Sequence, residues 1–429
     1  MRILQVVINT DKRSYKWEVV LLLWVAFFLN QADRQTFNIV LPQIQEQIGA
    51  SDSTMGLLSM LFTVFFAITI PLAGILADKS GRSRQVWIST LVFSTATVCT
   101  GWSGGLFSLI LFRCMGTAVG QGLFAPTYSG IIAQYHGPST RARAISLHQT
   151  SSYLGIIVCG FLAGKIAETA GWPYAFFVFG GLGVLFTPVL AWRLRDKAAD
   201  SGREEKAAAP KAEPVSLPKA TAEIFRIPTA TCIIVAYCTL IFGLNGYLTW
   251  MPKHLKESFD LSLSSAGFHS MFWHNAAAFL GIMVSGVLSD RIAARSGGKN
   301  RLLLQAAGLL LASPCIVLMG ASHSFPAVCA ALAGFGLFRG VFDSSLLTAF
   351  YEVIPPKYYS TSVALLFFFG NATGALSPWI LGIISDRVGL SFGIVSMSAF
   401  WVAGSVAILL ARVLFFEKDA EKCRREARG

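Results

Sequence analysis

The stretch Gly74-Ile-Leu-Ala-Asp78-Lys79-Ser80-Gly81-Arg82-Ser83-Arg84 separates two long apolar runs of the chain. Its glycine, acid, base, glycine and base stand at fixed offsets, where one predicted membrane helix ends and the next begins. A looser copy, Gly286-Val-Leu-Ser-Asp290-Arg291, occurs in the second half of the chain. Two copies of one loop in a very apolar chain predict duplicated halves, which is how many secondary transporters are built.

The composition is that of a membrane protein with many spans. Of the 429 residues, 54% are hydrophobic and 14% are charged, whereas soluble domains carry about 25% charged residues. A bilayer core requires roughly 20 apolar residues per helix, and backbone groups in lipid must be paired within their own segment, so we expect helices. The apolar runs give twelve candidate spans: 17–41, 54–77, 85–102, 105–132, 143–168, 173–193, 229–251, 265–288, 302–320, 325–350, 358–384 and 391–415.

One segment, residues 195–228, breaks the apolar pattern. It is charged, rich in Ala and Pro and without periodicity, which predicts a cytoplasmic linker. Six spans precede it and six follow. We therefore expect an all-α membrane protein with an N-terminal six-helix bundle (1–194), the linker, a C-terminal six-helix bundle (229–416) and a cytoplasmic tail (417–429).

The formal net charge of +12 is concentrated in loops that fall on one side of the predicted membrane. This distribution argues against nucleic-acid binding and, by the positive-inside rule, places both termini in the cytoplasm. The first span is too long for a signal peptide and is expected to be a retained anchor. We therefore expect a multi-pass protein of the inner (plasma) membrane. The basic residues of the cytoplasmic loops are Lys79, Arg82, Arg84, Arg141, Arg143, Arg291, Arg295, Lys299 and Arg301.

Several other functions lack their sequence signals. No Walker loop is present, which disfavours an ATP-driven pump. No nucleophile–base pattern occurs, so we do not expect an enzyme. The eight cysteines and six histidines have no metal-ligand spacing, and we expect neither a metal nor a cofactor.

The loop at 74–84 resembles the cytoplasmic loop between the second and third helices of the major facilitator superfamily. Arg113-Cys-Met-Gly116-Thr-Ala-Val-Gly120-Gln121-Gly122 is similar to the arginine–glycine motif of its fourth helix. Asn30-Gln-Ala-Asp33-Arg34-Gln35 looks like the Asp-Arg pair of the spinster-like and organic-anion (anion:cation symporter-like) branch, and the stretches 136–149 and 377–387 resemble that branch too. The resemblance covers nearly the whole chain and implies the major facilitator fold, with alternating access between two bundles.

In one position the chain departs from this branch. The relatives usually carry a glutamate after the glycines of the fourth helix, where it often takes part in proton coupling, but here the nearby residue is Gln121. Because glutamine cannot titrate, Asp33 becomes the main acid of the N-terminal half, with Asp343 as a rival coupling residue.

Charged residues inside predicted spans are costly and usually face a cavity and pair. Asp33 and Arg113 both lie roughly 10–12 Å below the outer surface by the helical rise per residue, so we expect them to pair, either as a static lock or as a pair that opens during transport. Arg34 points about 100° away from Asp33, and in the organic-anion relatives the matching arginine contacts substrate. Arg339 and Asp343, at i and i+4, share one helix face and can also pair.

Other polar residues in the spans are candidates for a substrate pocket, although each is also a plausible packing or interface residue. With the arginines, the predicted substrate-binding set is Arg34, Arg113, Gln121, Gln149, Tyr153, Asn245, His274, Arg339 and Asn371. The three arginines exceed Asp33 and Asp343 by one positive charge, which favours an anionic substrate.

The two loop motifs are predicted to form a conformational latch. Asp78 lies at a helix C-terminus, which is unfavourable for an anion, so it needs compensation from Arg82, a neighbouring helix start or a backbone amide. In the superfamily this cluster clips the halves together on the cytoplasmic side; otherwise the basic residues are only topology signals. The predicted latch residues are Gly74, Asp78, Gly81, Arg82, Asp290 and Arg291.

These features predict a secondary active transporter that works by alternating access, with one cavity that opens in turn to each side of the membrane. The expected substrate is a small organic anion such as a sugar acid or carboxylate, moved with H⁺ or Na⁺ by a monomer. One alternative is a spinster-like lipid or lysolipid transporter, since the chain holds 33 phenylalanines. Another is a membrane sensor or binding protein without flux. The substrate, the coupling ion and the direction of transport do not follow from the sequence.

Overall fold

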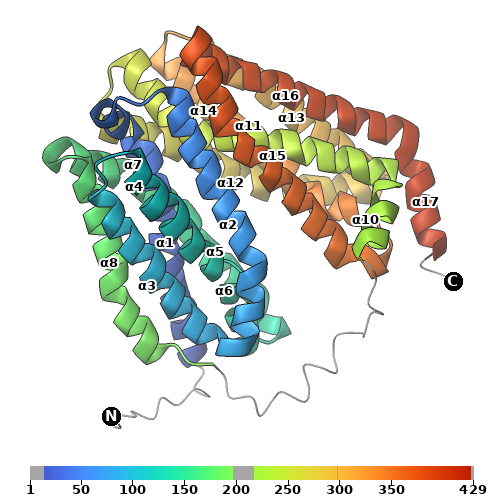
Figure 1. Ribbon diagram of the computed structural model, residues 1–429. Helices are drawn as coiled ribbons and strands as arrows, with labels where there is room; N and C mark the ends of the chain where they lie inside the picture. The colour runs from blue at the N-terminus through green and yellow to red at the C-terminus, as the bar shows by residue number, and fades with distance from the viewer. Residues whose placement is uncertain (1–13, 197–216, 297, 427–429) are drawn as a thin grey trace. The chain divides into compact units, whose positions relative to one another are not determined.

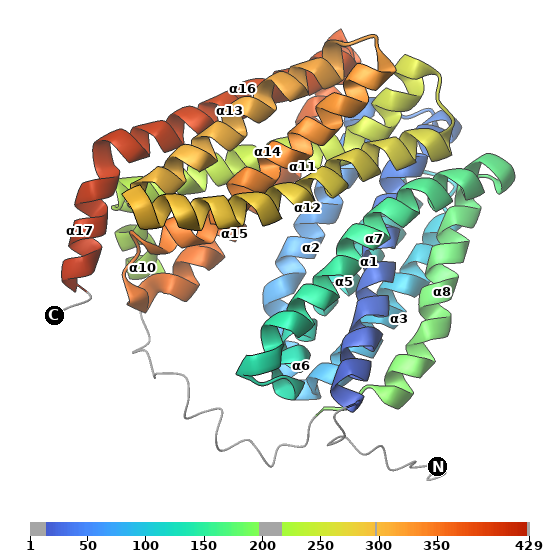
Figure 2. The same cartoon turned by 180° about the vertical axis from the view of Figure 1, so that it is seen from behind.

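The computed structural model describes residues 14–196, 217–296 and 298–426, and every regular element within these ranges is a helix (Figures 1 and 2). A helix lies at each of the twelve predicted spans. Ten helical segments are long and apolar enough to cross a membrane. The other two predicted spans correspond to α1 (Tyr15–Ile48) and α3 (Arg82–Gly101). Helix α1 is more polar than the ten membrane-spanning candidates, because it carries Asn30, Asp33 and Arg34 near its middle.

The chain divides into two compact units. Unit 1 comprises residues 1–49, 61–207 and 262–268, and unit 2 comprises residues 50–60, 208–261 and 269–429. The helices of unit 1 are α1, most of α2 (Asp52–Ser80), α3, α4 (Leu106–Leu109), η1 (Ile110–Thr117), α5 (Ala118–Phe124), α6 (Thr127–Tyr135), α7 (Pro138–Ala170) and α8 (Trp172–Arg193).

Within unit 1, α1 packs along α7 and α3 packs along α8. A buried apolar cluster, which includes Val19, Leu23, Phe124 and Ile131, joins α1 to the fourth predicted span. In a membrane such side chains stabilise the unit chiefly through close van der Waals packing between the helices. The unit therefore holds α1, which carries the predicted Asp-Arg pair, firmly against its neighbours.

The fourth predicted span is not one regular helix. It begins as α4, continues as the π-helical turn η1, returns to α-helix in α5 and breaks near Pro126 before α6. Pro126 cannot donate a backbone hydrogen bond, which explains the break. A π-helical turn within an α-helix is frequently found at a functional site, and η1 contains Arg113.

Unit 2 contains the remaining helices. They are α10 (Leu217–Phe225), α11 (Pro228–Phe259), most of α12 (Leu263–Ser296), α13 (Lys299–Ala321), α14 (Phe325–Tyr351), η3 (Pro356–Tyr358), α15 (Tyr359–Val388), α16 (Leu390–Leu410), η4 (Ala411–Phe415) and α17 (Phe416–Glu426). Helix α13 packs against α14 and α16, while α11 packs against α15 and α16. The short helix α17 buries Phe416, Ala420 and Cys423, which recur on one of its faces.

Helices α2 and α12 each have residues in both units, and each is capped by a carboxylate within the unit that holds its first turns. In unit 2, the Asp386 carboxylate accepts hydrogen bonds from the backbone N–H groups of Asp52 (2.9 Å) and Ser53 (3.0 Å). In unit 1, Glu168 accepts from the backbone N–H of Ser264 at 2.7 Å. Carboxylates favour helix N-termini because unpaired N–H groups and the positive end of the helix dipole lie there.

Glycines allow very close helix approach at the same two places. A β-carbon on Gly56 would lie 2.2 Å from the carbonyl oxygen of Pro378, and one on Gly267 would lie 2.0 Å from that of Gly160. Any larger residue would force these backbones apart, as is usual for small residues at membrane helix contacts. Gly155 and Gly164 of the fifth span likewise face backbone atoms of α1 and of residues 263–264.

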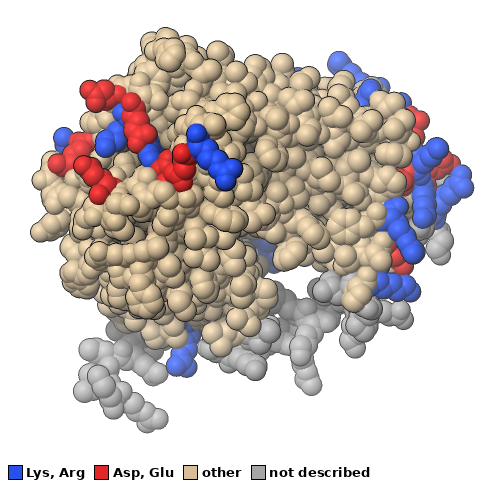
Figure 3. All heavy atoms as spheres, turned by 45° about the horizontal axis from the view of Figure 1, so that its top comes forward, with Lys and Arg blue, Asp and Glu red and all other residues tan. Residues whose placement is uncertain are grey.

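The surface seen in Figure 3 is mostly uncharged, and its Lys, Arg, Asp and Glu side chains gather in a few groups. Large apolar side chains such as Leu185, Val284 and Phe368 are more than half exposed. Exposure of so much apolar surface to water would be unfavourable, whereas contact of the same surface with lipid carries no such cost. The surface is therefore that of a membrane-embedded protein.

Candidate functional site

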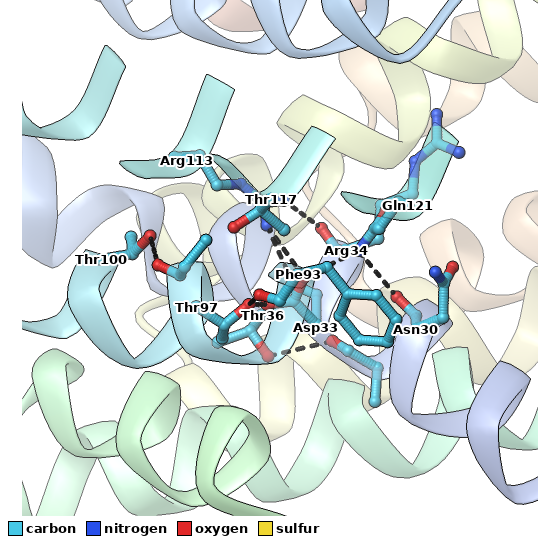
Figure 4. Close-up of polar contacts among 12 residues, drawn as sticks. Asn30, Asp33, Arg34, Thr36, Phe93, Thr97, Thr100, Arg113, Thr117 and Gln121 are labelled. Atoms are coloured by element: carbon cyan, nitrogen blue, oxygen red, sulfur yellow. Dashed lines mark hydrogen bonds and ion pairs between the residues drawn. The ribbon is translucent and has the colours of Figure 1, made fainter. Parts of the chain in front are cut away.

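The predicted Asp33–Arg113 ion pair is present in unit 1, at the centre of a buried polar cluster (Figure 4). Arg113 Nη1 lies 3.4 Å from Asp33 Oδ2, and the two side chains are only 4% and 3% exposed. Thr97 Oγ1 donates to Asp33 Oδ1 at 2.8 Å, and Gln121 Nε2 donates to Asp33 Oδ2 at 2.7 Å. The carboxylate thus ties α1 to α3, η1 and α5.

The π-helical turn η1 presents Arg113 to the backbone of α1 as well as to Asp33. Arg113 Nη2 donates to the carbonyl oxygen of Arg34 at 2.9 Å. The guanidinium also lies 4.3 Å from the centre of the Phe62 ring and 5.3 Å from that of Phe37. Such cation–π contacts add about 0.5–2 kcal/mol when the cation is desolvated. In this state Arg113 is enclosed within unit 1, with its two terminal nitrogens bonded to α1 and its Nε without a hydrogen-bond partner among the described residues, so it offers almost no surface to a substrate.

The glutamine that replaces the usual glutamate has a definite place in this cluster. Gln121 is buried, and its Nε2 group donates both to Asp33 and to the carbonyl oxygen of Asn30, the latter at 3.2 Å. A glutamate at this distance from Asp33 would bring two carboxylates together, and one of them would have to hold a proton. The Gln121 amide is neutral and removes that repulsion. Asp33 is therefore the one carboxylate at this point, and it accepts hydrogen bonds from Gln121 and Thr97.

Arg34 differs from Arg113 in its surroundings. Its guanidinium lies 5.1 Å from the ring centre of Phe66 and 5.6 Å from that of Phe62. The side chain is partly exposed, and among the described residues no carboxylate lies within ion-pair distance of it. Within the described part of the chain, Arg34 is therefore a cation that no carboxylate neutralises, and it lies against the rings of Phe62 and Phe66.

In unit 2, Arg339 Nε lies 3.2 Å from Asp343 Oδ2, so the predicted i, i+4 pair of α14 is also present. These two side chains are 19% and 22% exposed. Arg339 Nη1 lies 3.0 Å from Nε2 of His274 on α12. The predicted residues His274, Arg339 and Asp343 therefore form one contiguous group.

The other predicted substrate-binding residues are not drawn into either group by hydrogen bonds described here. Gln149 and Asn371 are exposed, and the Asn371 amide donates to the carbonyl oxygen of Phe367 in its own helix. Tyr153 and Asn245 are partly buried. Asn245 packs where α11 passes Gly374 of α15. The Asn371 amide thus has a partner within its own helix. For Gln149, Tyr153 and Asn245 a role in substrate binding stays a prediction.

In the second loop motif, the acid does not pair with the arginine that follows it in the sequence. In unit 2, the partner of Asp290 is Arg301 at 3.2 Å, which lies at the start of α13, while Arg291 is exposed. Arg301 also pairs with Glu352 at 2.6 Å. Asp290 is thus compensated by the side chain of an arginine on the next helix rather than by Arg291.

In unit 1, the surroundings of Gly74 and the side chain of Asp78 lie outside what the structure describes. Gly81 has φ +88°, which suits glycine, and it directly precedes α3. The Asp196 carboxylate accepts from the backbone N–H of Ser83 at 3.0 Å and so caps α3. The guanidinium of Arg82 lies against Gly130 of α6.

Sequence reasoning missed several residues that the structure places in these groups. Thr97, Phe62 and Phe66 surround Asp33, Arg113 and Arg34, but threonine and phenylalanine are common in membrane helices and gave no signal. On α11, the buried Lys253 pairs with Asp52 of α2. Its position as one of few basic residues in the predicted outer loops was the available signal. The described residues contain no group of three or more His, Cys, Asp or Glu arranged to hold a metal.

The fold, the apolar surface and the buried charge groups define a multi-pass membrane transporter. The Major Facilitator Superfamily profile matches residues 23–378, and the chain belongs to this superfamily. It is consequently a transporter rather than an enzyme.

The chain is similar in sequence to transporters of acidic compounds. It is 24% identical to the "Hexuronate transporter" of Bacillus subtilis over 403 residues, covering 92% of each chain. It is also 24% identical to the "D-galactonate transporter" of Escherichia coli O6:H1, covering 92% of this chain and 95% of the relative. The chloroplastic "Ascorbate transporter" of Arabidopsis thaliana is 26% identical, with 87% of this chain and 70% of the relative covered.

Solved structures of the same fold include a bacterial homologue of the human lysosomal transporter Spinster. Its inward-facing, occupied form has a TM-score of 0.82 at 20% identity, covering 95% of this chain and 99% of that one. The unoccupied form has a TM-score of 0.77, covering 97% and 99%. At this identity the likeness establishes the fold alone.

Proposed function

We propose that the protein moves a small organic anion, such as a sugar acid, across the plasma membrane by alternating access, with Arg34 as the main anion-binding residue. The observation that carries this proposal is the unneutralised state of Arg34. Asp33 neutralises Arg113, and Asp343 neutralises Arg339, so the net positive charge of the five groups resides on Arg34. The relatives named for hexuronate and galactonate support an acidic sugar as the cargo.

The surroundings of Arg34 suit a carboxylate ligand. An arginine offers a planar fork of donors that matches a carboxylate in two-point contact. Phe62 and Phe66 hold the back of the guanidinium and leave its N–H edge free to donate.

The energy source in this proposal is a proton gradient that acts through Asp33. Asp33 is the one acid of its cluster, because Gln121 occupies the neighbouring position. Asp343 is the corresponding acid of unit 2. Sodium coupling remains the competing proposal, and it predicts uptake that depends on sodium and is unchanged when the pH gradient is collapsed.

A direct experiment is binding and uptake of radiolabelled D-glucuronate and D-galactonate by the purified protein in proteoliposomes. Arg34→Ala is expected to weaken binding at least a hundredfold, and Arg34→Lys to retain part of it because the charge persists without the fork. Arg143→Ala, which removes an exposed arginine at the start of α7, is the matched control. Unchanged affinity in Arg34→Ala would remove the proposal.

A lysolipid cargo is the second candidate, and one feature of unit 1 favours it. A cavity of about 530 Å³ between α2 and α5 is lined mainly by apolar side chains, among them Phe65, Ile68, Leu72 and Leu123. An acyl chain is the natural occupant of such a lining. Binding and uptake of labelled lysophosphatidylglycerol, with no binding of either sugar acid, would favour this candidate over the first.

A further inference from the structure

His274 occupies an enclosed position beside the charge pair of unit 2. The residue is fully buried on α12. Its ring centre lies 4.7 Å from that of Tyr247 on α11 and 4.8 Å from that of Phe335 on α14. The titratable and charged groups around it are Tyr247, Arg339 and, behind Arg339, Asp343. The Tyr247 hydroxyl donates to the carbonyl oxygen of Ser270 and so is turned to the backbone.

The hydrogen bond between His274 and Arg339 has only one possible direction. Arg339 Nη1 and His274 Nε2 are 3.0 Å apart, and a guanidinium has donors but no acceptor. The Nε2 lone pair must therefore accept, and the ring hydrogen must be on Nδ1, which has no partner among the described atoms. A proton on Nε2 would place two cations in contact, so His274 is neutral while Arg339 occupies this position.

Arg339 and a proton therefore compete for the same lone pair. The Arg339 side chain is 19% exposed, and its other described contact within the group is the ion pair with Asp343 of its own helix. An anion that draws the guanidinium away uncovers Nε2. The ring can then take a proton from water without meeting a second cation.

We propose that His274 is a proton-accepting coupling residue: binding of an anion at Arg339 releases His274 Nε2, which takes up one proton, and departure of the anion returns Arg339 and expels that proton. The inference rests on the proposed function, because it requires an anionic substrate. It adds a histidine of unit 2 to the acid of unit 1 as a site of proton coupling. One anion and one proton would enter together without net charge.

Reciprocal linkage gives the sign of the expected effect. Because the bound state holds one more proton than the free state, affinity for the anion rises as the pH falls. The dissociation constant should increase by up to tenfold per unit of rising pH within the range where His274 is protonated only in the complex. Calorimetry in buffers of different ionisation enthalpy should record uptake of up to one proton by this site.

The test uses D-galactonate as the probe and His274→Gln as the variant. The glutamine oxygen can replace Nε2 as an acceptor for Arg339 but cannot titrate. We expect the variant to bind D-galactonate within about threefold of wild type at high pH. It should lose the proton taken up at this site and the part of the pH dependence that this proton causes. His274→Asn, which also lacks a titrating ring, serves if the first variant fails to fold.

His269→Gln is the matched control on the same helix. His269 Nδ1 accepts from Trp273 Nε1 at 2.9 Å rather than from an arginine, so this variant should keep the wild-type pH dependence. Equal pH dependence in wild type and both His274 variants would overturn the inference and leave the proposed function intact. If the wild-type protein bound neither sugar acid, the proposed function would fall and this inference with it.

Discussion

The two units hold the same kind of ion pair in very different settings. In unit 1, Asp33 and Arg113 come from different helices, are almost completely enclosed and have further hydrogen bonds from Thr97 and Gln121. In unit 2, Arg339 and Asp343 are one turn apart on α14 and are about one-fifth exposed. The first pair joins helices, whereas the second leaves its arginine able to change partners.

This difference follows from the cost of burying charge. Removing one partner from an enclosed pair leaves the other charge without water or a counterion, which is strongly unfavourable. A partly exposed i, i+4 pair contributes little, because water compensates either charge when the pair opens. In this state the group in unit 1 therefore holds helices together, whereas the pair in unit 2 can open at a lower cost.

The largest expected effect on stability comes from Arg113→Ala. The variant strands Asp33 inside unit 1, which should lower the free energy of unfolding by about 3–5 kcal/mol. Arg339→Ala, the matched change in unit 2, should lower it by about 1 kcal/mol or less. Unfolding in detergent micelles, followed by circular dichroism, measures both.

The double variant Asp33→Asn/Arg113→Ala tests whether the first loss arises from the stranded charge. It should recover most of the stability lost in Arg113→Ala, because no uncompensated charge remains. Equal losses for Arg113→Ala and Arg339→Ala, or additive losses in the double variant, would abolish the distinction between the two units.

Asp33→Asn separates the two groups in function. It should abolish accumulation of sugar acid driven by a pH gradient while retaining counterflow exchange, which needs no net proton movement. It should retain the part of the pH dependence of anion affinity that arises from His274, because that residue is unchanged. Asp343→Asn is the comparison variant, and full proton-driven accumulation by Asp33→Asn in liposomes would contradict the assignment.

The smallest expected effect concerns His136, a buried histidine of unit 1 that lies between α6 and α7. Its Nε2 contacts the carbonyl oxygen of Lys16 at 3.1 Å, and its Nδ1 contacts Thr140 Oγ1 at 3.2 Å. Unlike His274, it has both ring nitrogens engaged by neutral groups. Burial lowers the pKa of His136 below its ordinary value.

The sign of this effect is set by the unfolded chain, which binds a proton at His136 more readily than the folded chain does. Stability should therefore decline as the pH falls below the usual histidine pKa of about 6.5. His136→Gln should reduce the loss of Tm between pH 7.5 and 5.5 by about 1–2 °C. The variant should leave D-galactonate affinity unchanged at both pH values; a changed pH dependence of binding would show that unit 1 also contains a responsive histidine.

Much of the architecture could be predicted from the sequence, because the bilayer imposes a length and an apolar composition on each span. Helices lie at the predicted ranges, ten helical segments are long and apolar enough to cross a membrane, and both predicted ion pairs are present. Helical spacing alone was sufficient to predict the ion pair between Arg339 and Asp343, since residues four apart share a helix face. For Asp33 and Arg113, equal depth below the surface made the pairing reasonable.

Other features arose only from packing between helices. No residue pattern in the sequence indicated the π-helical turn that contains Arg113. Thr97 donates to Asp33 only because α3 lies beside α1. Likewise, Arg301 pairs with Asp290 and Glu352 only where three chain segments meet. Contacts of this kind depend on distances between residues far apart in the chain.

By itself, the sequence determined that the chain spans a membrane repeatedly, where its polar loop motifs lie and which charged residues must find partners. These properties depend on hydrophobicity and local spacing, which are written into consecutive residues. Tertiary structure alone decided that Arg113 is enclosed, that Arg34 lacks a carboxylate among the described residues, and that His274 accepts from Arg339. Burial and hydrogen bonding belong to the packed helices, because the environment of each charge is supplied by residues distant in sequence.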